Sequence, residues 1–569
     1  MTNNPQTVIP AESAIAPVLI KDDAALNRYL FEYQRNAYAM RHEAVGTKLE
    51  GWLNSGDDAC ETTYRLAREL EMPLVRVDAL KADAAVTRLL TPRQARRLRV
   101  VPLRAHNGLL AVAMEDPSSH DALQALEFVS PDRVLPLVAT ARGIRDAIAE
   151  NYDQVEDLET VRELGLDPAS KQGEASEAEA NRLASERPVV RIVHDMLSEA
   201  VQRRASDIHL RPGLRGMDVL FRIDSELVPV RSLLRALQPA VVSRVKVLAG
   251  MNLAEHRKPQ DGRTSFFLSD GAKIDLRISV MPTVFGESVV VRLLDAREGV
   301  WKSIDKLGLS DADRKRVESV MSRSHGMFLA TGPTGCGKST TLYAMLMEMR
   351  RQRVNILTIE DPVEFHIDDI QQMQVNRAAG FTFANALRNF LRHDPDVIMV
   401  GEIRDQETAE IAVESALTGH LLLSTLHTNT AATTITRLLD LGIEPYLLRA
   451  SLLAVVSQRL VRLTCRHCRE PEIVDPDVRA ALGVTEDEVF HRGRGCVQCE
   501  GLGVHRRRAV YELLVVTPRI RRLIVPGTEA DAIHQVGLEE GMTSITQAAV
   551  ALARSGEISL SEAWRVRAD

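Results

Sequence analysis

The chain has 569 residues, of which 45% are hydrophobic and 26% are charged, a composition typical of a protein with roughly three or four globular domains. The formal charge is −7 and the basic residues are spread along the chain, which argues against a global binder of nucleic acid or anionic lipid. No apolar run approaches the ~20 residues of a transmembrane helix, and the opening MTNNPQ lacks the basic start of a signal peptide. We therefore expect a cytoplasmic protein that reaches a membrane only through partners.

The first 150 residues are expected to form one domain. A helix is predicted over residues 24–41, after a poorly ordered lead. Asn107-Gly108 lies between apolar runs at 100–103 and 109–114, and this arrangement predicts a β-hairpin.

A charged linker is predicted over residues 151–187. Its second half is rich in Glu, Ala and Ser with few large apolar residues, so we expect that it cannot bury a core. A second domain, residues 188–300, then begins with an amphipathic helix over 189–203 and continues with strands over 218–223 and 273–279. Residues 301–304 are the expected hinge into a third domain, residues 301–569.

The third domain opens with a complete G-x-x-x-x-G-K-[ST] loop. An apolar run at 327–330 precedes the loop and a helix-like stretch at 340–350 follows it, which is the strand, loop and helix order that phosphate binding needs. The glycines let backbone N–H groups turn toward phosphates, Lys338 reaches the β- and γ-phosphates, and the Ser339 hydroxyl can hold Mg²⁺. The expected ATP-binding residues are Gly332, Pro333, Thr334, Gly335, Cys336, Gly337, Lys338, Ser339 and Thr340, with Cys336 a small spacer rather than a nucleophile.

Three further segments place polar groups at the ends of buried strands. Glu360 ends the run 356–359, although a simple strand-end turn is the alternative. Glu402 follows the run 397–400, where Gly401 occupies the position at which many P-loop proteins have a metal-binding aspartate. His420 and His427 flank a third apolar strand.

Four cysteines form two C-x-x-C knuckles, Cys465 with Cys468 and Cys496 with Cys499, separated by 27 residues. In a cytosolic chain this spacing favours a tetrathiolate Zn²⁺ site over disulfides, a redox pair or unligated thiols. The insertion is expected over residues 463–512. From 517 to 568 the chain is predicted to be helical, most clearly at 547–554 before Gly556.

Together these motifs resemble those of the type II secretion and type IV pilus assembly ATPases. The segments GPTGCGKSTT, ILTIEDPVEF, LRHDPDVIMVGEIRDQETA and TGHLLLSTLHTN are similar to the Walker A, aspartate, Walker B and histidine boxes of that family. Upstream, SDIH at 206–209, PQDGR at 259–263 and GESVVVRLL at 286–294 are similar to its second N-terminal domain. Arg211 and Ser225 depart from the usual Glu and Gly, but neither lies in a nucleotide box.

The resemblance implies an α/β fold class. It comprises a RecA-like P-loop ATPase core, a preceding α+β, PAS-like domain, an N-terminal α/β docking domain and a zinc-binding insertion. Glu360 or Glu402 would activate water. By resemblance Arg277 and Arg292, in cis or in trans, and Arg388 and Arg392 approach the nucleotide, the alternative being domain-packing ion pairs. His420 and His427 would sense the γ-phosphate or couple it to the subunit boundary.

The implied function is that of a homohexameric ATPase that powers assembly of pilin or pseudopilin fibres in type IV pilus biogenesis or type II secretion. ATP, Mg²⁺ and Zn²⁺ are the implied cofactors. Its partners would be an inner-membrane platform protein and the cytoplasmic part of an assembly-complex membrane protein, with no nucleic acid. Three alternatives are a pilus-retraction motor, a nucleotide-gated scaffold without turnover and a DNA translocase. The N-terminal domain has no Arg-Leu-Gly repeat, so cyclic di-GMP binding is not expected.

Overall fold

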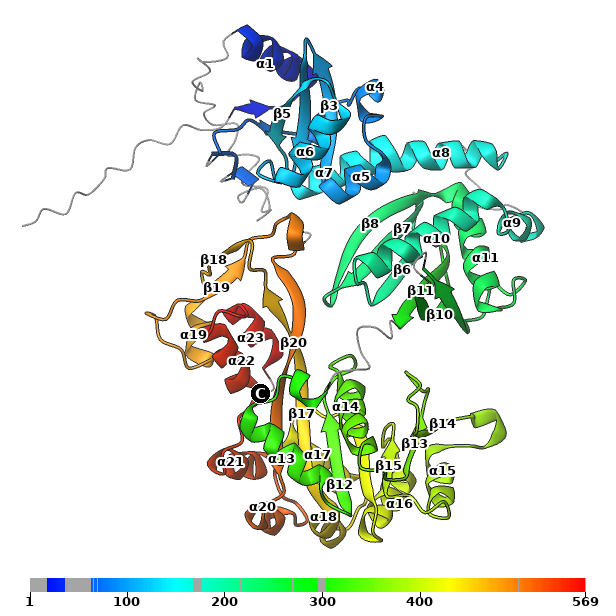
Figure 1. Cartoon of the computed structure of the whole chain (residues 1–569), viewed down its shortest axis with the longest axis vertical. Coiled ribbons are helices and arrows are strands. Elements are labelled where there is room, and N and C mark those ends of the chain that lie inside the picture. The colour runs from blue at the N-terminus through cyan, green and yellow to red at the C-terminus, as the bar shows by residue number, and fades with distance from the viewer. Residues whose placement is uncertain are drawn as a thin grey trace, which may run out of the picture. The chain divides into compact units, whose positions relative to one another are not determined.

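The structure of the protein is a computed structural model that describes residues 18–35, 63–64, 66–68, 70–166, 177–214, 216–268, 271–294, 303–499 and 501–567 (Figure 1). The chain divides into two compact units. The first comprises residues 1–268, 276–293 and 494–502, and the second comprises residues 269–275, 294–493 and 503–569. Every helix among the described residues is too short or too polar to span a bilayer.

The first unit begins with a five-stranded sheet in the order β1-β2-β5-β4-β3. β3 and β4 form an antiparallel hairpin whose turn residues, Asn107 and Gly108, have φ values of 46° and 80°. Two left-handed residues match the twist of the flanking strands, and the predicted hairpin is confirmed. The predicted helix begins at Asp23 and is described to Arg35, and residues 36–41 lie outside the described residues. The elements are β1 (Leu19–Ile20), α1 (Asp23–Arg35), β2 (Leu74–Val75), α4 (Ala84–Thr87), α5 (Pro92–Leu98), β3 (Val100–His106), β4 (Leu109–Met114), α6 (His120–Val129), β5 (Arg133–Val138) and α7 (Ala141–Ile148).

Two helices occupy much of the range expected to be a charged linker: α8 (Gln154–Glu163) and α9 (Glu177–Leu183). The carboxylate of Asp157 on α8 is buried and accepts hydrogen bonds from the Arg231 side chain at 2.6 Å and the Leu234 N–H at 2.9 Å. Leu183 is 1% exposed where α9 packs against α11 (Gln238–Ala249). The expectation that the second half of this range cannot bury a core is therefore wrong for α9, where Leu183 is buried. In the first half, α8 is attached to its neighbours by the buried Asp157 and by Val161, which is fully buried.

The first unit continues with a six-stranded sheet in the order β8-β7-β6-β11-β10-β9. Antiparallel pairs join β8, β7, β6 and β11. The predicted amphipathic helix and the two predicted strands are confirmed as α10, β7 and β10. The bounds are α10 (Arg187–Gln202), β6 (Asp207–Pro212), β7 (Gly216–Ile223), β8 (Glu226–Leu234), β9 (Gln260–Phe267), β10 (Lys273–Thr283) and β11 (Gly286–Leu294). Of the expected hinge, residues 301 and 302 lie outside the described residues.

The second unit is built on a seven-stranded sheet in the order β14-β13-β15-β16-β12-β17-β20. Neighbouring strands of this sheet are parallel except β17 and β20, which are antiparallel. The strands are β12 (Gly326–Thr331), β13 (Ile356–Glu360), β14 (Gln371–Gln374), β15 (Val397–Val400), β16 (Leu421–Leu426), β17 (Leu452–Thr464) and β20 (Val504–Val515). The helices are α13 (Asp311–Met321), α14 (Lys338–Arg350), α15 (Phe383–Phe390), α16 (Gln406–Leu417), α17 (Ala431–Asp440), α18 (Pro445–Ser451), α20 (Pro518–Leu523), α21 (Ala530–Glu539), α22 (Ile545–Arg554) and α23 (Leu560–Val566).

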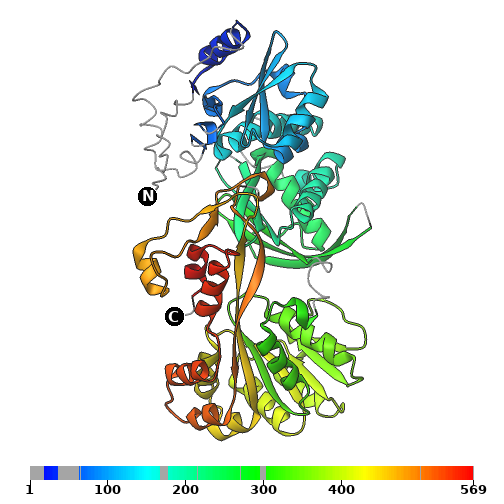
Figure 2. The ribbon, with the colours of Figure 1, turned by 60° about the vertical axis from the view of Figure 1, so that its left-hand side comes forward.

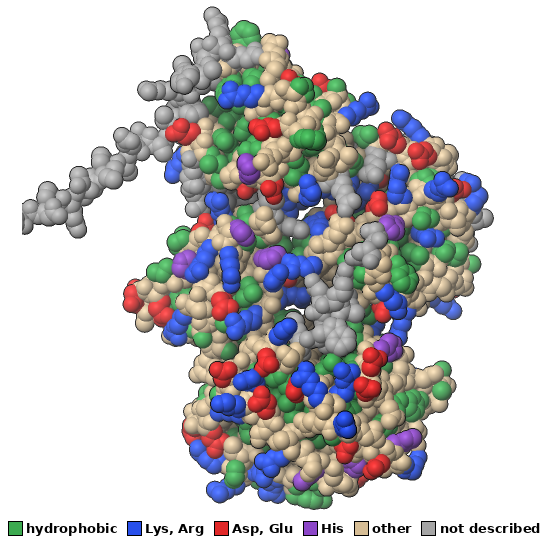
Figure 3. Space-filling view, viewed as in Figure 1, with side chains coloured by type: hydrophobic (Ala, Val, Ile, Leu, Met, Phe, Trp, Pro, Cys, Tyr) green, Lys and Arg blue, Asp and Glu red, His purple; other side chains and the backbone are tan. Residues whose placement is uncertain are grey.

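Apolar cores lie on both faces of this sheet. Along β12, Met327 and Leu329 enter the core shared with α15, α16 and α17, whereas Phe328 and Ala330 enter the core shared with α13 and α14. A parallel sheet covered on both faces explains why its strands are continuous apolar runs. Ligands of such sheets bind at the carboxyl ends of the strands. On the face of the second unit that Figure 3 shows, Lys and Arg are interspersed with Asp and Glu.

β17 and β20 extend beyond the other strands as a long two-stranded ribbon (Figure 2). The insertion between them carries β18 (Arg469–Pro471), α19 (Pro476–Ala481) and β19 (His491–Gly493). A separate core joins this ribbon to the C-terminal helices, through Val461, Val510, Ile545 and Leu560. The predicted C-terminal helices are confirmed, and Gly556 ends α22 with a φ of 71°.

Candidate functional site

The predicted phosphate loop, residues 332–337, connects the end of β12 to the start of α14. Gly332, Gly335 and Gly337 have φ values of 136°, 78° and 94°, which residues with a Cβ rarely adopt. A Cβ at Gly332 would also lie 2.5 Å from the Gln458 carbonyl oxygen. The glycines therefore permit a tight loop at the N-terminus of α14, where backbone N–H groups favour an anion. Residues 333–335 and Ser339 are exposed to a ligand, and Thr340 is half-buried.

Lys338 is buried at the start of α14, with 8% of the residue exposed. Its Nζ donates to the carbonyl oxygens of Gly332 at 2.7 Å and Pro333 at 3.2 Å, and lies 3.5 Å from Nδ1 of His427. Burial lowers the pKa of Lys338. A phosphate oxygen can replace these carbonyl oxygens as the partner of the ammonium group.

Glu360 ends β13 and is 4% exposed. Its carboxylate accepts hydrogen bonds from the hydroxyls of Tyr343 and Thr358, the latter at 2.8 Å, and from Nε2 of Gln372 at 3.1 Å. Burial raises the pKa of Glu360, while the three donors act against that rise. Three donors fix this carboxylate in one orientation.

Glu402 follows β15, one residue beyond Gly401. Its carboxylate contacts Arg404 at 2.5 Å and Nε2 of His427 at 3.3 Å, and 14% of the side chain is exposed. A Cβ at Gly401 would lie 3.3 Å from the Ile359 carbonyl oxygen and 3.4 Å from Cα of Glu360. This close approach of β13 explains the glycine where an aspartate is common elsewhere. His427 thus contacts both Lys338 and Glu402.

The structure separates the two histidines that flank β16. β16 pairs in parallel with β12, from Gly326 opposite Leu421 to Thr331 opposite Leu426. His427 therefore follows the carboxyl end, beside the phosphate loop, whereas His420 precedes the amino end, about 20 Å away for six residues of strand. Nδ1 of His420 lies 2.9 Å from the Ser415 carbonyl oxygen. The expectation that His420 senses the γ-phosphate is wrong for the loop of its own chain, and a role at a subunit boundary stays a prediction.

The four predicted arginines lie in two places. Arg388 on α15 donates to Glu407 at 2.8 Å, and Arg392 donates to the Asn389 side chain. Arg277 and Arg292 lie in the first unit, on β10 and β11, and Arg292 pairs with Asp207 at 2.9 Å. Arg292 and Arg388 thus form ion pairs within their own domains, which was the alternative to a role at the nucleotide. The approach of all four arginines to the nucleotide stays a prediction.

Several site residues lie outside the sequence motifs. Tyr343 and Gln372 enclose Glu360, Arg404 contacts Glu402, and Gln458 on β17 contacts the phosphate loop. One signal was available for Gln458, because an amide in the apolar run LLAVVSQRLV must find a partner when buried. Tyr343 gives no such signal, because an aromatic residue on a helix is usually part of a core.

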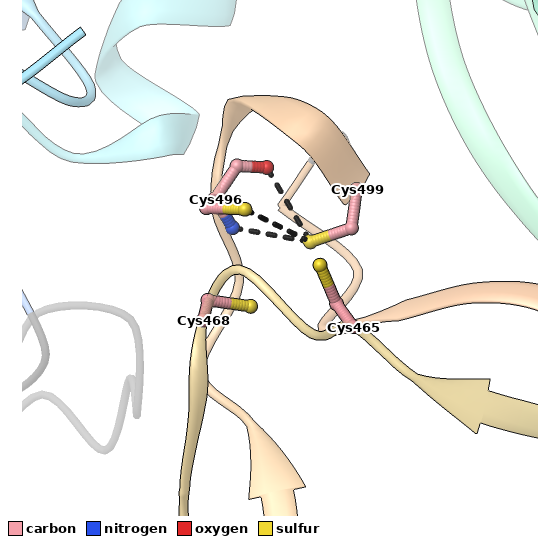
Figure 4. A group of neighbouring side chains, drawn as sticks. All are labelled: Cys465, Cys468, Cys496 and Cys499. Atoms are coloured by element: carbon pink, nitrogen blue, oxygen red, sulfur yellow. Dashed lines mark hydrogen bonds between the residues drawn. The ribbon is translucent and has the colours of Figure 1, made fainter. Parts of the chain in front are cut away.

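The two cysteine knuckles converge in the structure (Figure 4). The sulfur atoms of Cys465, Cys468, Cys496 and Cys499 all lie within 4.8 Å of one another, and none of these four cysteines is in a disulfide. Sγ of Cys496 lies 3.7 Å from Sγ of Cys499. Four sulfurs placed tetrahedrally at about 2.3 Å from one ion lie about 3.8 Å apart, so the cluster fits Zn²⁺.

Known protein families match almost the whole described chain. Residues 182–565 match the family described as Type II/IV secretion system protein, and residues 70–158 match the MshEN domain. The chain is 41% identical over 507 residues to the type IV pilus assembly ATPase PilB of Thermus thermophilus, a match that covers 87% of this chain and 56% of that protein. It is 38% identical to PilB of Myxococcus xanthus, covering 87% and 89% of the two chains. It is 45% identical over 400 residues to the type II secretion system protein E of Pseudomonas aeruginosa, covering 69% and 79%.

A solved structure supports the fold. The ATPase DotB of Legionella pneumophila is 22% identical and superposes with a TM-score of 0.50, covering 65% of this chain and 94% of that one. This likeness confirms the predicted RecA-like core preceded by an N-terminal domain. With the family match over more than half of its length, the chain belongs to the Type II/IV secretion system protein family.

Proposed function

We propose that this protein is a cytoplasmic ATPase that powers assembly of pilin or pseudopilin fibres, in type IV pilus biogenesis or type II secretion. The observation that carries the proposal is that His427 contacts both Lys338 and Glu402 beside a complete phosphate loop. The relatives of this chain are named for pilus assembly and type II secretion. These relatives support assembly rather than retraction. Glu402 argues against a scaffold without turnover, and the interspersed charges argue against a DNA translocase.

Hydrolysis requires an in-line water, charge neutralisation at the γ-phosphate, and a base. Lys338 neutralises phosphate charge, and the exposed Ser339 hydroxyl would hold Mg²⁺, which supplies further charge stabilisation when bound. Glu402 is the proposed base, because it is partly exposed and is connected to Lys338 through His427. Glu360 is enclosed by three donors and is proposed to hold the neighbouring strand ends in position.

The active assembly is proposed to be a homohexamer. Arg277 and Arg292 belong to a different unit from Lys338, so they can stabilise phosphate charge only when the second N-terminal domain closes on a phosphate loop, in cis or in trans. Arg388 and Arg392 would add charge from the ATPase domain itself. The six-stranded sheet with α10 and α11 supports assigning that N-terminal domain to the PAS-like type.

The remaining parts are proposed to serve structure and docking. The cysteine cluster would hold a structural Zn²⁺. The MshEN match at 70–158 supports an N-terminal domain that docks on the cytoplasmic part of an assembly-complex membrane protein, while the motor acts on an inner-membrane platform protein. Contact with the membrane would run only through these partners.

The test is ATP hydrolysis by the purified full-length chain as a function of its concentration. We expect the specific activity to rise until the ring is saturated, and ATP analogues to shift the protein toward a hexamer in analytical ultracentrifugation. Arg277→Ala should bind ATP nearly normally and lose turnover even at saturating ATP. A monomer with full, concentration-independent activity would contradict the ring motor and leave a solitary P-loop enzyme.

A further inference from the structure

Gln458 is a buried polar residue beside the phosphate loop that no motif assigns. It is 1% exposed and lies on β17, which pairs in parallel with β12 up to Thr331 opposite Ser457. Gln458 is therefore one position beyond the last paired residue before the loop. Its side chain therefore lies beside the phosphate loop, beyond the paired part of β12 and β17.

The Gln458 amide joins the phosphate loop to the first turn of α14. Nε2 donates to the Cys336 carbonyl oxygen at 2.8 Å, and Oε1 accepts from the Thr341 hydroxyl at 2.9 Å. A Cβ at Gly337 would lie 3.2 Å from Nε2. The glycine therefore leaves room for the amide as well as permitting the loop's backbone conformation.

The bond to Cys336 has a consequence for the next residue. In a trans peptide, the C=O of Cys336 and the N–H of Gly337 lie in the same plane and point in opposite directions. Fixing the carbonyl toward Gln458 therefore directs the Gly337 N–H away from β17. If this peptide turned over, the buried Gln458 amide would lose its acceptor, which is costly where water does not replace it.

We propose that Gln458 is a positioning residue for nucleotide binding, which holds the peptide between Cys336 and Gly337 in the orientation that presents its N–H to a phosphate. Gln458 itself does not touch the phosphates. The proposal rests on the proposed function only in requiring that the loop binds a nucleotide. The proposal predicts that weakening the Gln458 contacts loosens the nucleotide-free loop, with a smaller effect on the rate of the chemical step.

Cys336 offers a reporter that is independent of catalysis. Cys336 is 3% exposed, and burial raises the pKa of its thiol, so alkylation of the ordered loop should be slow. The variant Gln458→Glu keeps an acceptor for Thr341 but removes the donor to Cys336 and places a carboxylate against a carbonyl oxygen. Thr341→Val removes the second contact and leaves the first, and it also removes a side-chain hydrogen bond between Thr341 and Tyr511. Gln352→Glu, on an exposed residue after α14, is the matched control.

The experiment measures alkylation of Cys336 by peptide mass spectrometry in the full-length, nucleotide-free protein. We expect about tenfold faster labelling in Gln458→Glu, a smaller increase in Thr341→Val and none in Gln352→Glu. Affinity for the fluorescent analogue mant-ATP should fall about tenfold in Gln458→Glu, whereas kcat at saturating ATP should fall less than about threefold.

Labelling of Cys336 at the parent rate in folded Gln458→Glu would overturn the proposal, as would a fall in kcat with unchanged mant-ATP affinity. If circular dichroism shows that Gln458→Glu does not fold, Thr341→Val decides by the same two criteria. Faster labelling and weaker mant-ATP binding in a protein whose parent lacks ATP turnover would support the positioning role while contradicting the proposed motor.

Discussion

The phosphate loop and the cysteine cluster are both connected to β17, and they are held in different ways. Protein donors and acceptors hold the phosphate loop: Lys338 binds its carbonyl oxygens, and Gln458 binds the Cys336 carbonyl oxygen. The cysteine cluster begins at Cys465, directly after β17 ends at Thr464. Within the cluster, the N–H and the sulfur of Cys496 contact the Cys499 sulfur, which is a weak hydrogen-bond partner, and the N–H groups of Cys499 and Gly501 donate to the Cys496 carbonyl oxygen at 3.2 and 2.9 Å.

The difference indicates which interactions stabilise the conformation of each loop. The phosphate loop can keep its form without a ligand, because the Lys338 and Gln458 side chains already bind three of its carbonyl oxygens. The cysteine cluster brings four thiols together, and a metal is the partner that would stabilise them there. The rest of the insertion has independent support, because the buried carboxylate of Glu472 accepts from the Leu560 and Ser561 N–H groups at 2.6 and 3.1 Å. Losing the metal should therefore disturb the C-terminal end of β17 and spare the contacts of Gln458 in the middle of the strand.

The largest effect is expected from Lys338→Ala. This change removes the cation that both binds the phosphates and stabilises transition-state charge, so hydrolysis should fall by at least about 10³-fold. Lys315→Ala, on an exposed residue of α13, is the control and should retain activity. Steady-state phosphate release measures both variants. Substantial turnover by Lys338→Ala would remove the phosphate loop from the site.

Glu402→Gln should have the next largest effect. The amide cannot accept the proton of water, so kcat should fall by roughly 10²-fold while ATP binding is preserved. Binding of mant-ATP and single-turnover hydrolysis separate the two quantities. Glu414→Gln, an exposed change on α16, should behave as the parent protein. If Glu402→Gln hydrolyses ATP at the parent rate, the role of base passes to Glu360.

Cys465→Ser tests the cysteine cluster that follows the C-terminal end of β17. We expect the purified parent to contain one zinc per chain by elemental mass spectrometry, and the variant to lose it. Residues 463–512 should then become sensitive to limited proteolysis, while mant-ATP affinity changes by less than about threefold because the phosphate loop keeps its own hydrogen bonds. Cys60→Ser, outside the two knuckles, should retain the metal. Parent protein without zinc would refute this assignment.

Much of this site could be predicted because its motifs act locally. Strand, glycine loop and helix are adjacent in sequence, so the loop at 332–337 and its lysine were identifiable directly. The cysteine knuckles were also identifiable, because metal ligands occur at fixed spacings. Glu402 and His427 were found because each lies within two residues of the carboxyl end of a buried strand.

The remaining features depend on pairings between distant segments. His420 was grouped with His427 because both flank one apolar run, although a parallel strand sends its two ends to opposite edges of the sheet. Gln458 lies 122 residues from its partner Cys336, a separation that local periodicity cannot bridge. The helix α8 was missed for the same reason, because Asp157 is stabilised by Arg231, 74 residues away. The amino-acid composition of a segment does not distinguish a buried, paired aspartate from an exposed one in a linker.

The smallest effect on turnover is expected from Glu562→Gln, which tests an ion pair near the C-terminal end of β17. The carboxylate of Glu562 on α23 is 2% exposed and pairs with Arg462 on β17 at 2.8 Å and with Arg565 at 2.5 Å. Burial alone would raise the pKa of Glu562, but the hydrogen bonds from Arg565 and Arg462 outweigh it and hold the pKa below the ordinary 4.5. ATP turnover should be unchanged, because the pair stabilises the C-terminal helices rather than the phosphate loop.

The stability of Glu562→Gln should instead depend on pH. Because the folded-state pKa is depressed, the parent's stabilisation is fully present above pH 4.5 and is lost as the pH falls through the folded pKa. Denaturant unfolding should therefore show the variant less stable by about 2–3 kcal/mol at pH 7, with the gap narrowing below pH 4.5. The exposed pair of Arg519 with Glu539 provides the control, since Glu539→Gln should cost less than about 1 kcal/mol at either pH. A gap for Glu562→Gln that stays constant from pH 7 to low pH would show that packing of α23, rather than its charge, attaches the C-terminal helices to β17.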